Sequence, residues 1–321
     1  MLDHFIYSLN ATLPVFLIIV LGWGLRRAKL LGEGFVLTAN KLTYTVTLPV
    51  MLFLEIAQMD AGALLDLKFL GFGFFSSLAC ILLIWAGARL FLKDKSMVGS
   101  FVQGSYRGSA ALLGVALMQN IYGSAAYAPV MILSVAPLYN IMAVIILMLE
   151  GEREGQEGKK HQAKQALIGV LKNPILWGIL LGLPFAALGI TFPRVIMASL
   201  ESVGELATPL ALLAIGASFQ IDAAKSCLKP ALIATFLKLV GQAAVFLPLA
   251  IWLGFREQQL VAILVMFASP TAAASYIMSV NLDNDGELSS SIIVDALLRR
   301  DHHCMDFPAA QPGADMMLLA K

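Results

Sequence analysis

Two apolar stretches, residues 100–122 and 260–280, contain the residues of this chain whose types and spacing could bind a small ion. Each stretch is long enough to cross a bilayer, and each has small residues and helix breakers near its middle. A helix that breaks inside hydrocarbon leaves N–H and C=O groups that need partners, and the N-terminus of a half-helix suits a carboxylate. We therefore predict that the two breaks together form a site for an anion.

The candidate binding residues are of three chemical types. Arg107 could neutralise an anion, or its side chain could instead extend to the lipid headgroups. Asn40 could line a cavity or form a hydrogen bond between helices, and the breakers and small residues could serve only helix packing. The substrate-binding candidates are Asn40, Arg107, Gly108, Ser109, Ala110, Gly114, Ser269, Pro270 and Thr271.

Backbone groups and one lysine complete the set of polar candidates. Lys238 and Gln242 are four residues apart in an apolar stretch and share a helix face. We expect the Lys238 side chain to extend to the cytoplasmic surface, because no acid lies near it in the sequence. The N–H groups that we expect to be free for an anion are those of Ser109, Ala110, Thr271 and Ala272.

Composition indicates a membrane protein and argues against several other classes. The chain is 59% hydrophobic and 13% charged, whereas soluble domains have about 25% charged residues. The three cysteines form no spaced motif, so we predict no metal site, no cofactor and no disulfide framework. No apolar stretch clusters His, Asp, Glu or Cys, which argues against an enzyme, and no basic cluster indicates nucleic-acid binding.

Apolar runs of about 20 residues predict an all-α polytopic membrane protein. Lys and Arg concentrate in alternate loops, which predicts an N-terminus outside, a cytoplasmic central linker and a multi-pass protein of the inner cell membrane. The start of the chain has no basic segment, so we expect the first run to remain as a helix. The nine predicted spans are roughly 5–25, 35–58, 69–92, 100–122, 127–149, 166–189, 196–219, 230–253 and 259–280.

Breaker placement predicts two related halves. Pro49 in the second span and Pro209 in the seventh occupy the same slot, as do the two broken stretches. A unit of five spans ends on the side opposite its start, so a second copy is inserted upside down. The predicted units are a first repeat (1–149), a charged linker (150–165), a second repeat (166–294) and a polar tail (295–321).

These motifs together resemble the auxin efflux carrier family over roughly residues 5–294. The resemblance rests on Asn40-Lys41-Leu42 with Leu48-Pro49-Val50-Met51-Leu52-Phe53, on Gln103-Gly104-Ser105-Tyr106-Arg107-Gly108 with Leu113-Gly114, on Lys172-Asn173-Pro174, on Pro209 with Leu212 and Gly216, and on Ala268-Ser269-Pro270-Thr271-Ala272. It implies a ten-helix inverted-repeat (5+5) transporter fold with a scaffold part and a transport part. It also implies that broken helices four and nine cross at the substrate site. Bacterial members of the family resemble permeases for malate, malonate and other small organic anions.

The sequence departs from the family pattern at two positions of the fourth span. Ser109 stands where members often have Asn, and Ala116 stands where they often have Pro. Both changes weaken polar or helix-breaking character near the expected site, so they bear on substrate preference.

The end of the chain lacks the apolar stretch that a tenth helix requires. Residues 286–294 begin like a helix, but Asp295, Arg299, Arg300 and Asp301 follow. We hypothesise a frameshift near Val294, because the tail read one nucleotide later can encode an apolar segment; a natural divergent tail is the alternative. The nucleotide sequence decides between them.

The function that we predict is secondary transport of small organic anions such as dicarboxylates, by alternating access around the crossed helices. The alternatives are a carrier of an aromatic carboxylate and a non-transporting membrane sensor or scaffold. The predicted partners are the organic anion and the lipid bilayer, and a homodimer is an open alternative.

Overall fold

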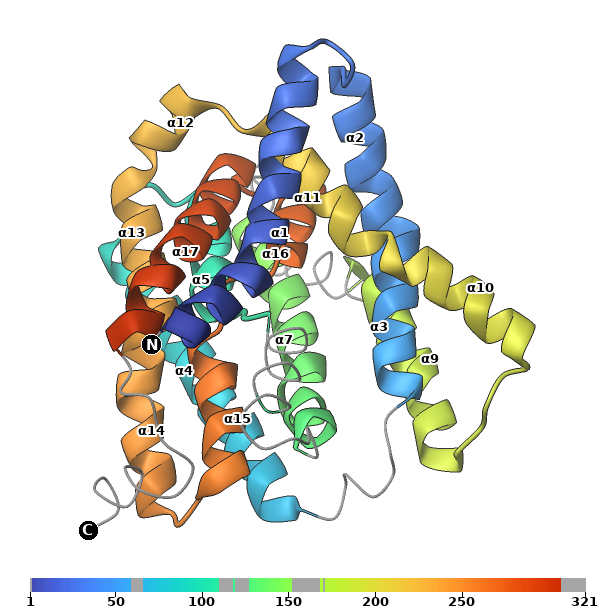
Figure 1. Ribbon diagram of the computed structural model, residues 1–321, viewed down its shortest axis with the longest axis vertical. Helices are drawn as coiled ribbons and strands as arrows, with labels where there is room; N and C mark the ends of the chain where they lie inside the picture. Colours follow the sequence, from blue (N-terminus) through green and yellow to red (C-terminus); the bar gives the residue numbers. More distant parts are fainter. Residues whose placement is uncertain are drawn as a thin grey trace.

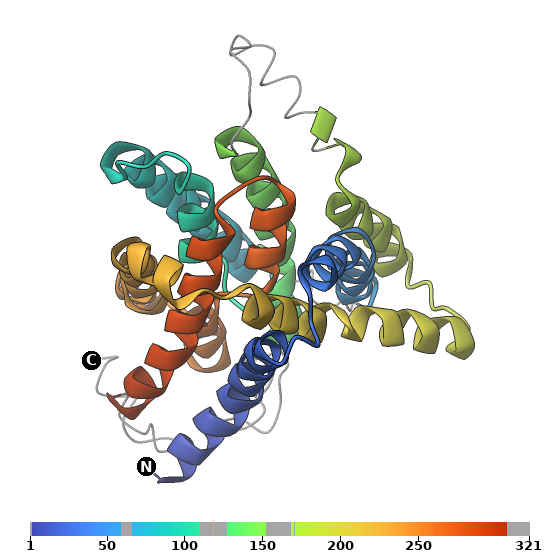
Figure 2. The same ribbon diagram turned by 90° about the horizontal axis from the view of Figure 1, so that it is seen from above.

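The computed structural model describes residues 2–58, 66–109, 118, 127–151, 168–169 and 171–306, and every named element in it is a helix. The helices fall into two groups, which Figure 2 shows side by side. Four of the continuous helical runs among the described residues are long and apolar enough to cross a membrane: Leu67–Phe91, Val130–Glu150, Arg194–Ser218 and Leu228–Trp252. The prediction of an all-α polytopic membrane protein is therefore confirmed.

The first group contains the helices of the first, second, sixth and seventh predicted spans (Figure 1). In it, α1 packs along α11 and α3 packs along α9. Each half thus contributes one partner to each contact. The division into two inverted repeats stays a prediction. The elements are α1 (Leu2–Arg27), α2 (Glu33–Leu42), the π-helical turn η1 (Thr43–Thr47), α3 (Leu48–Ala57), α9 (Pro174–Leu188), α10 (Arg194–Glu205) and α11 (Ala207–Ser218).

Glycines allow these paired helices to approach closely. A Cβ atom at Gly22 of α1 would clash with the Leu213 carbonyl of α11, and one at Gly178 of α9 would clash with the Pro49 carbonyl of α3. Small residues drive such packing in lipid, where burial of apolar side chains gives little driving force. These glycines therefore bring the backbones of the paired helices into close contact.

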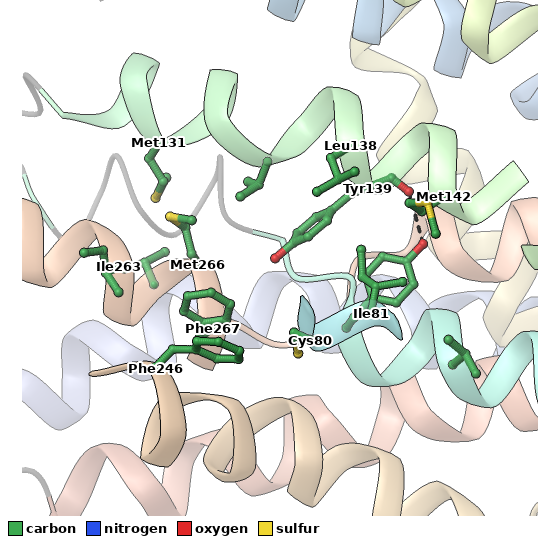
Figure 3. Close-up of a cluster of buried hydrophobic side chains, with 14 of the residues drawn as sticks. Cys80, Ile81, Met131, Leu138, Tyr139, Met142, Phe246, Ile263, Met266 and Phe267 are labelled. Carbon is green, nitrogen blue, oxygen red and sulfur yellow. Dashed lines mark hydrogen bonds between the residues drawn. The ribbon is translucent and has the colours of Figure 1, made fainter. Parts of the chain in front are cut away.

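The second group contains the remaining helices and the largest buried apolar cluster. Its members are α4 (Leu67–Phe91), α5 (Val98–Tyr106), α7 (Ala128–Glu150), α13 (Leu228–Phe236), the π-helical turn η3 (Leu237–Gly241), α14 (Gln242–Trp252), α15 (Glu257–Ala268), α16 (Ala274–Asn281) and α17 (Gly286–Asp306), while α12 (Ile221–Ser226) leads into α13. Figure 3 shows the cluster, where Phe246 of α14 stacks on Phe267 of α15 with ring centroids 4.6 Å apart.

Apolar side chains also cover the outside of the molecule. On α4, Phe75 is 69% exposed and Leu83 is 70% exposed, and many other large apolar side chains share this exposure. Apolar surface of this extent marks contact with lipid or with a partner, and lipid fits helices of this length.

The end of the chain is helical, but among the described residues it provides no tenth membrane span. The helix start predicted at 286–294 is present in α17, which continues as secondary structure to Asp306. α17 is not among the helical runs that are apolar enough to cross a membrane, in agreement with the prediction from its polar composition. Its first half is buried through Leu288, Ile292 and Ile293, because these residues lie on the face that packs against its neighbours. Its second half has the charged residues of the sequence, including Asp295 paired with Arg299 at 2.8 Å. Residues beyond 306, and most of the predicted linker, lie outside the described part of the chain.

Candidate functional site

The two predicted breaks are present, and they meet. α5 ends at Tyr106 and α15 ends at Ala268. Gly108 and Thr271 then form an antiparallel β-bridge between the two extended segments. Its hydrogen bonds run from Ser109 N–H to the Pro270 carbonyl at 2.8 Å and from Ala272 N–H to the Arg107 carbonyl at 3.1 Å. The backbone groups that the breaks release therefore satisfy one another, as the hydrocarbon environment demands.

Local sequence explains why the helices stop here. Pro270 has no N–H, so it cannot bond the carbonyl four residues earlier, and it disfavours helical backbone at Ser269. Ser269 accordingly has an extended backbone with ψ of 146°. In the other segment Arg107 leaves helical geometry with ψ of 100°. Gly108 follows, and its lack of a Cβ allows close approach, since a Cβ there would clash with Ser269 Oγ.

Side chains satisfy the end of α5. Thr271 Oγ1 donates to the Gly104 carbonyl at 2.8 Å, and Gln242 Nε2 donates to the Ser105 carbonyl. Both carbonyls lie in the last turn of α5, where no intrahelical donor remains. The crossing is therefore stabilised by contacts from two other segments.

The backbone donors differ from those expected. The N–H groups of Ser109 and Ala272 are used in the bridge, so they are not free for an anion. Among the described residues, the N–H groups of Thr271, Ala273 and Ala274 at the start of the second half-helix have no acceptor. Of the predicted donors, Ser109 and Ala272 are therefore used in the bridge and Thr271 is free, because the two extended segments pair with each other. Ala110 and Gly114 lie outside the described residues.

Arg107 lies at the crossing and is 5% exposed. Its guanidinium donates to Asn140 Oδ1 at 2.6 Å and lies 3.0 Å from Met278 Sδ. Extension of this side chain to the headgroups, one of the two alternatives above, is therefore wrong, because its partners lie within the protein. No ion pair joins Arg107 to a carboxylate among the described residues, although Glu55 of α3 is close enough to act on it electrostatically. Within the described part of the chain, the charge at the crossing is buried and has no ion-pair partner.

Asn40 connects the two groups of helices. Its side-chain amide lies 3.4 Å from the Tyr276 hydroxyl of α16, which also bonds Ser218 of α11 at 2.7 Å. Asn281 donates to the Asn40 carbonyl at 3.3 Å. The interhelical hydrogen bond, one of the two alternatives for Asn40, is confirmed. A role in substrate binding stays a prediction.

Asn140, Thr43 and Thr47 were not predicted from the sequence. Thr43 and Thr47 lie in η1, which contacts α16, and their buried hydroxyl oxygens have no partner among the described residues. Asn140 accepts a hydrogen bond from Arg107. It is the single amide side chain in the apolar stretch 127–149, and this isolated polar residue was a signal in the sequence. Thr43 and Thr47 gave a weaker signal, because threonine often bonds its own helix and therefore occurs widely in membrane helices.

Lys238 is the largest correction. Its side chain is fully buried, and its ammonium donates to the carbonyls of Met266 and Phe267 instead of reaching the membrane surface. The π-helical turn η3 places it at the end of α15. The prediction looked for an acidic side chain as the partner of Lys238, whereas the acceptors are main-chain carbonyls.

Comparisons with known proteins show which family the chain belongs to. The chain is 26% identical over 198 residues to proteins called "Uncharacterized transporter YfdV" in Escherichia coli K12 and in Shigella flexneri. The match covers 60% of this chain and 62% of each relative, so it spans less than two thirds of their length. The family profile described as "Membrane transport protein" matches residues 7–298. The chain therefore belongs to this family of membrane transport proteins, the auxin efflux carrier family.

Proposed function

We propose that the protein is a secondary carrier of small organic anions, including dicarboxylates, and that it works by alternating access around the crossing. The observation that carries the proposal is Arg107, a buried cation at the crossing without a paired carboxylate among the described residues. A charged residue inside a membrane protein is costly and is usually functional. An anion would supply the missing countercharge.

The surroundings of Arg107 support a carboxylate as the ligand. The free N–H groups of Ala273 and Ala274 begin α16, and the positive end of a helix dipole attracts anions. Asn140 adds a polar side chain that bonds Arg107, and η1, which contains Thr43 and Thr47, contacts α16. Substrate-binding roles for Asn40, Arg107, Gly108, Ser109, Ala110, Gly114, Ser269, Pro270 and Thr271 remain part of this proposal.

A cavity supports access from one side. It has a volume of about 240 Å³ and lies between α11, α12, α16 and α17, with Ser218, Tyr276 and Glu287 in its wall. Tyr276 and Ser218 are also the residues that join the two groups of helices. We propose that this cavity opens on the cytoplasmic side, because α12 and the start of α13 carry Lys225 and Lys229, and basic residues between membrane spans stay in the cytoplasm. With this orientation, the N-terminus lies on the outer side of the inner cell membrane.

The test is uptake by purified protein in proteoliposomes. We expect saturable uptake of radiolabelled malate or malonate above protein-free vesicles, with inhibition by other short dicarboxylates. Indole-3-acetate as a competitor tests the aromatic alternative. Stronger inhibition by indole-3-acetate than by dicarboxylates would indicate that aromatic carboxylates are the substrate class. The absence of uptake and of counterflow for every carboxylate, with a protein shown to be folded, would contradict the proposal.

A further inference from the structure

Lys238 is a buried cation that the proposed substrate site does not use. It lies in η3, in the middle of the continuous helix α13–η3–α14, and its side chain is 0% exposed. Its ammonium donates to the Met266 carbonyl at 3.0 Å and to the Phe267 carbonyl at 3.3 Å. No ion pair joins it to a carboxylate within the described part of the chain. Its charge is therefore directed at the end of α15.

The break in α15 explains why these carbonyls need a donor. In an α-helix the carbonyl of residue i accepts from the N–H of residue i+4. The donor for Met266 would come from Pro270, which has no N–H, and the donor for Phe267 would come from Thr271, which lies in the extended bridge. A buried carbonyl without a partner is costly. Lys238 supplies both bonds and also places a positive charge at the negative end of the helix dipole.

Gln242 does the same for the other half-helix. The Ser105 carbonyl of α5 would accept from Ser109 N–H, but that group donates to Pro270 across the crossing. Gln242 Nε2 donates to the Ser105 carbonyl instead. One helix therefore bonds the ends of both broken helices, through two side chains four residues apart.

The ammonium of Lys238 is closely packed at the crossing. A Cβ atom at Gly108 would lie 2.8 Å from Lys238 Nζ, so the ammonium lies directly against the backbone of the crossing. Its two acceptor residues, Met266 and Phe267, project into the apolar cluster that Figure 3 shows. The surroundings leave the ammonium bonded to helix ends and closely packed.

We propose that Lys238 and Gln242 are positioning residues, which hold the ends of α15 and α5 in the crossed geometry that substrate transport requires. Their effect on transport rests on the proposed function. Their effect on the crossing itself does not, so the two can be tested apart.

The first experiment measures the crossing directly, by hydrogen–deuterium exchange of the purified protein. We expect Lys238→Met to speed amide exchange in peptides that cover residues 264–275 by at least about tenfold, because bonds from a charged donor are lost. Lys238→Arg, which keeps the charge and donors, should restore most of the protection. Lys229→Met, an exposed lysine of the same helix, is the matched control. Unchanged exchange in Lys238→Met would overturn the proposal.

Two further variants keep the test decisive if Lys238→Met folds poorly. Gln242→Leu should speed exchange in residues 103–109 and leave residues 264–275 unchanged. Pro270→Ala returns an N–H to position 270, so adding Lys238→Met in that background should cost clearly less protection than in the wild type. Equal losses in both backgrounds would show that Lys238 does not replace the donor that Pro270 lacks.

The second experiment measures transport of labelled malonate. A positioning role predicts that Lys238→Met lowers the maximal rate about tenfold or more while KM stays within about twofold, with partial rescue by Lys238→Arg. A raised KM at an unchanged maximal rate would show substrate contact and overturn the proposal. If wild-type protein transports no carboxylate, the proposed function fails, and the exchange experiment still decides the role of Lys238.

Discussion

Arg107 and Lys238 are two buried cations at the same crossing, and they differ in what they bond. Arg107 contacts the side chains of Asn140 and Met278, whereas Lys238 bonds main-chain carbonyls at the end of α15. Side-chain partners can rotate away when a ligand arrives, but a helix end moves only with the whole helix. The difference is the basis for the proposals that Arg107 binds the anion and that Lys238 holds the crossing in position.

Arg107→Gln tests the difference between the two cations with the largest expected effect. We expect a loss of dicarboxylate transport of about 100-fold, equivalent to ~3 kcal/mol, because the substrate would lose the buried positive charge that pairs with it. Arg107→Lys should retain part of the activity. The measurement is initial uptake in proteoliposomes, with Arg194→Gln, an exposed arginine of α10, as the control. An unchanged rate in Arg107→Gln would remove the distinction between the two cations.

Gly108→Ala tests the close packing between the crossing and Lys238. The added Cβ would meet Ser269 Oγ and Lys238 Nζ, so we expect a loss of about 2 kcal/mol in the free energy of unfolding, as overpacked sites show. Denaturant titration in detergent micelles gives this value. Gly87→Ala in α4 is the matched control, since nothing lies within 4 Å of its added Cβ. Equal stability of the two variants would show that the crossing is loosely packed.

Thr271→Val tests a side-chain bond from one broken segment to the other half-helix. The valine keeps the shape of threonine but loses the bond to the Gly104 carbonyl, so we expect a cost of about 1 kcal/mol in unfolding free energy. Thr45→Val, which removes an exposed bond to the Lys41 carbonyl, should cost less. The same titration compares them, and a larger loss in Thr45→Val would contradict the importance of the bridge.

Ser269→Ala should have the smallest effect. The hydroxyl of Ser269 is buried and has no partner among the described residues, so its removal should change the unfolding free energy by less than about 0.5 kcal/mol. Thermal unfolding of the two proteins side by side is sufficient. A loss as large as that of Thr271→Val would mean that Ser269 bonds a group of its own at the crossing.

Much of the fold follows from local properties that a sequence displays. Apolar length predicted the spans, and the end of α15 at Ala268 follows from Pro270, whose missing N–H acts on its own helix. Arg107 and the two breaks stood out because charge and helix breakers are rare in apolar segments. Polar composition argued against a tenth membrane span, and α17, which is helical to Asp306, is not among the described helical runs that are apolar enough to cross a membrane.

The candidate site was predicted only in part, because its contacts join distant segments. The sequence by itself determined an all-α membrane protein with two broken spans, and its motifs determined the family. Only the tertiary structure decided that Gly108 pairs with Thr271 and that the N–H groups of Ser109 and Ala272 donate hydrogen bonds in that pairing. It also decided that Lys238 bonds the end of α15. The reason is physical: a break fixes which backbone groups lose their partners, but the fold decides which groups replace them.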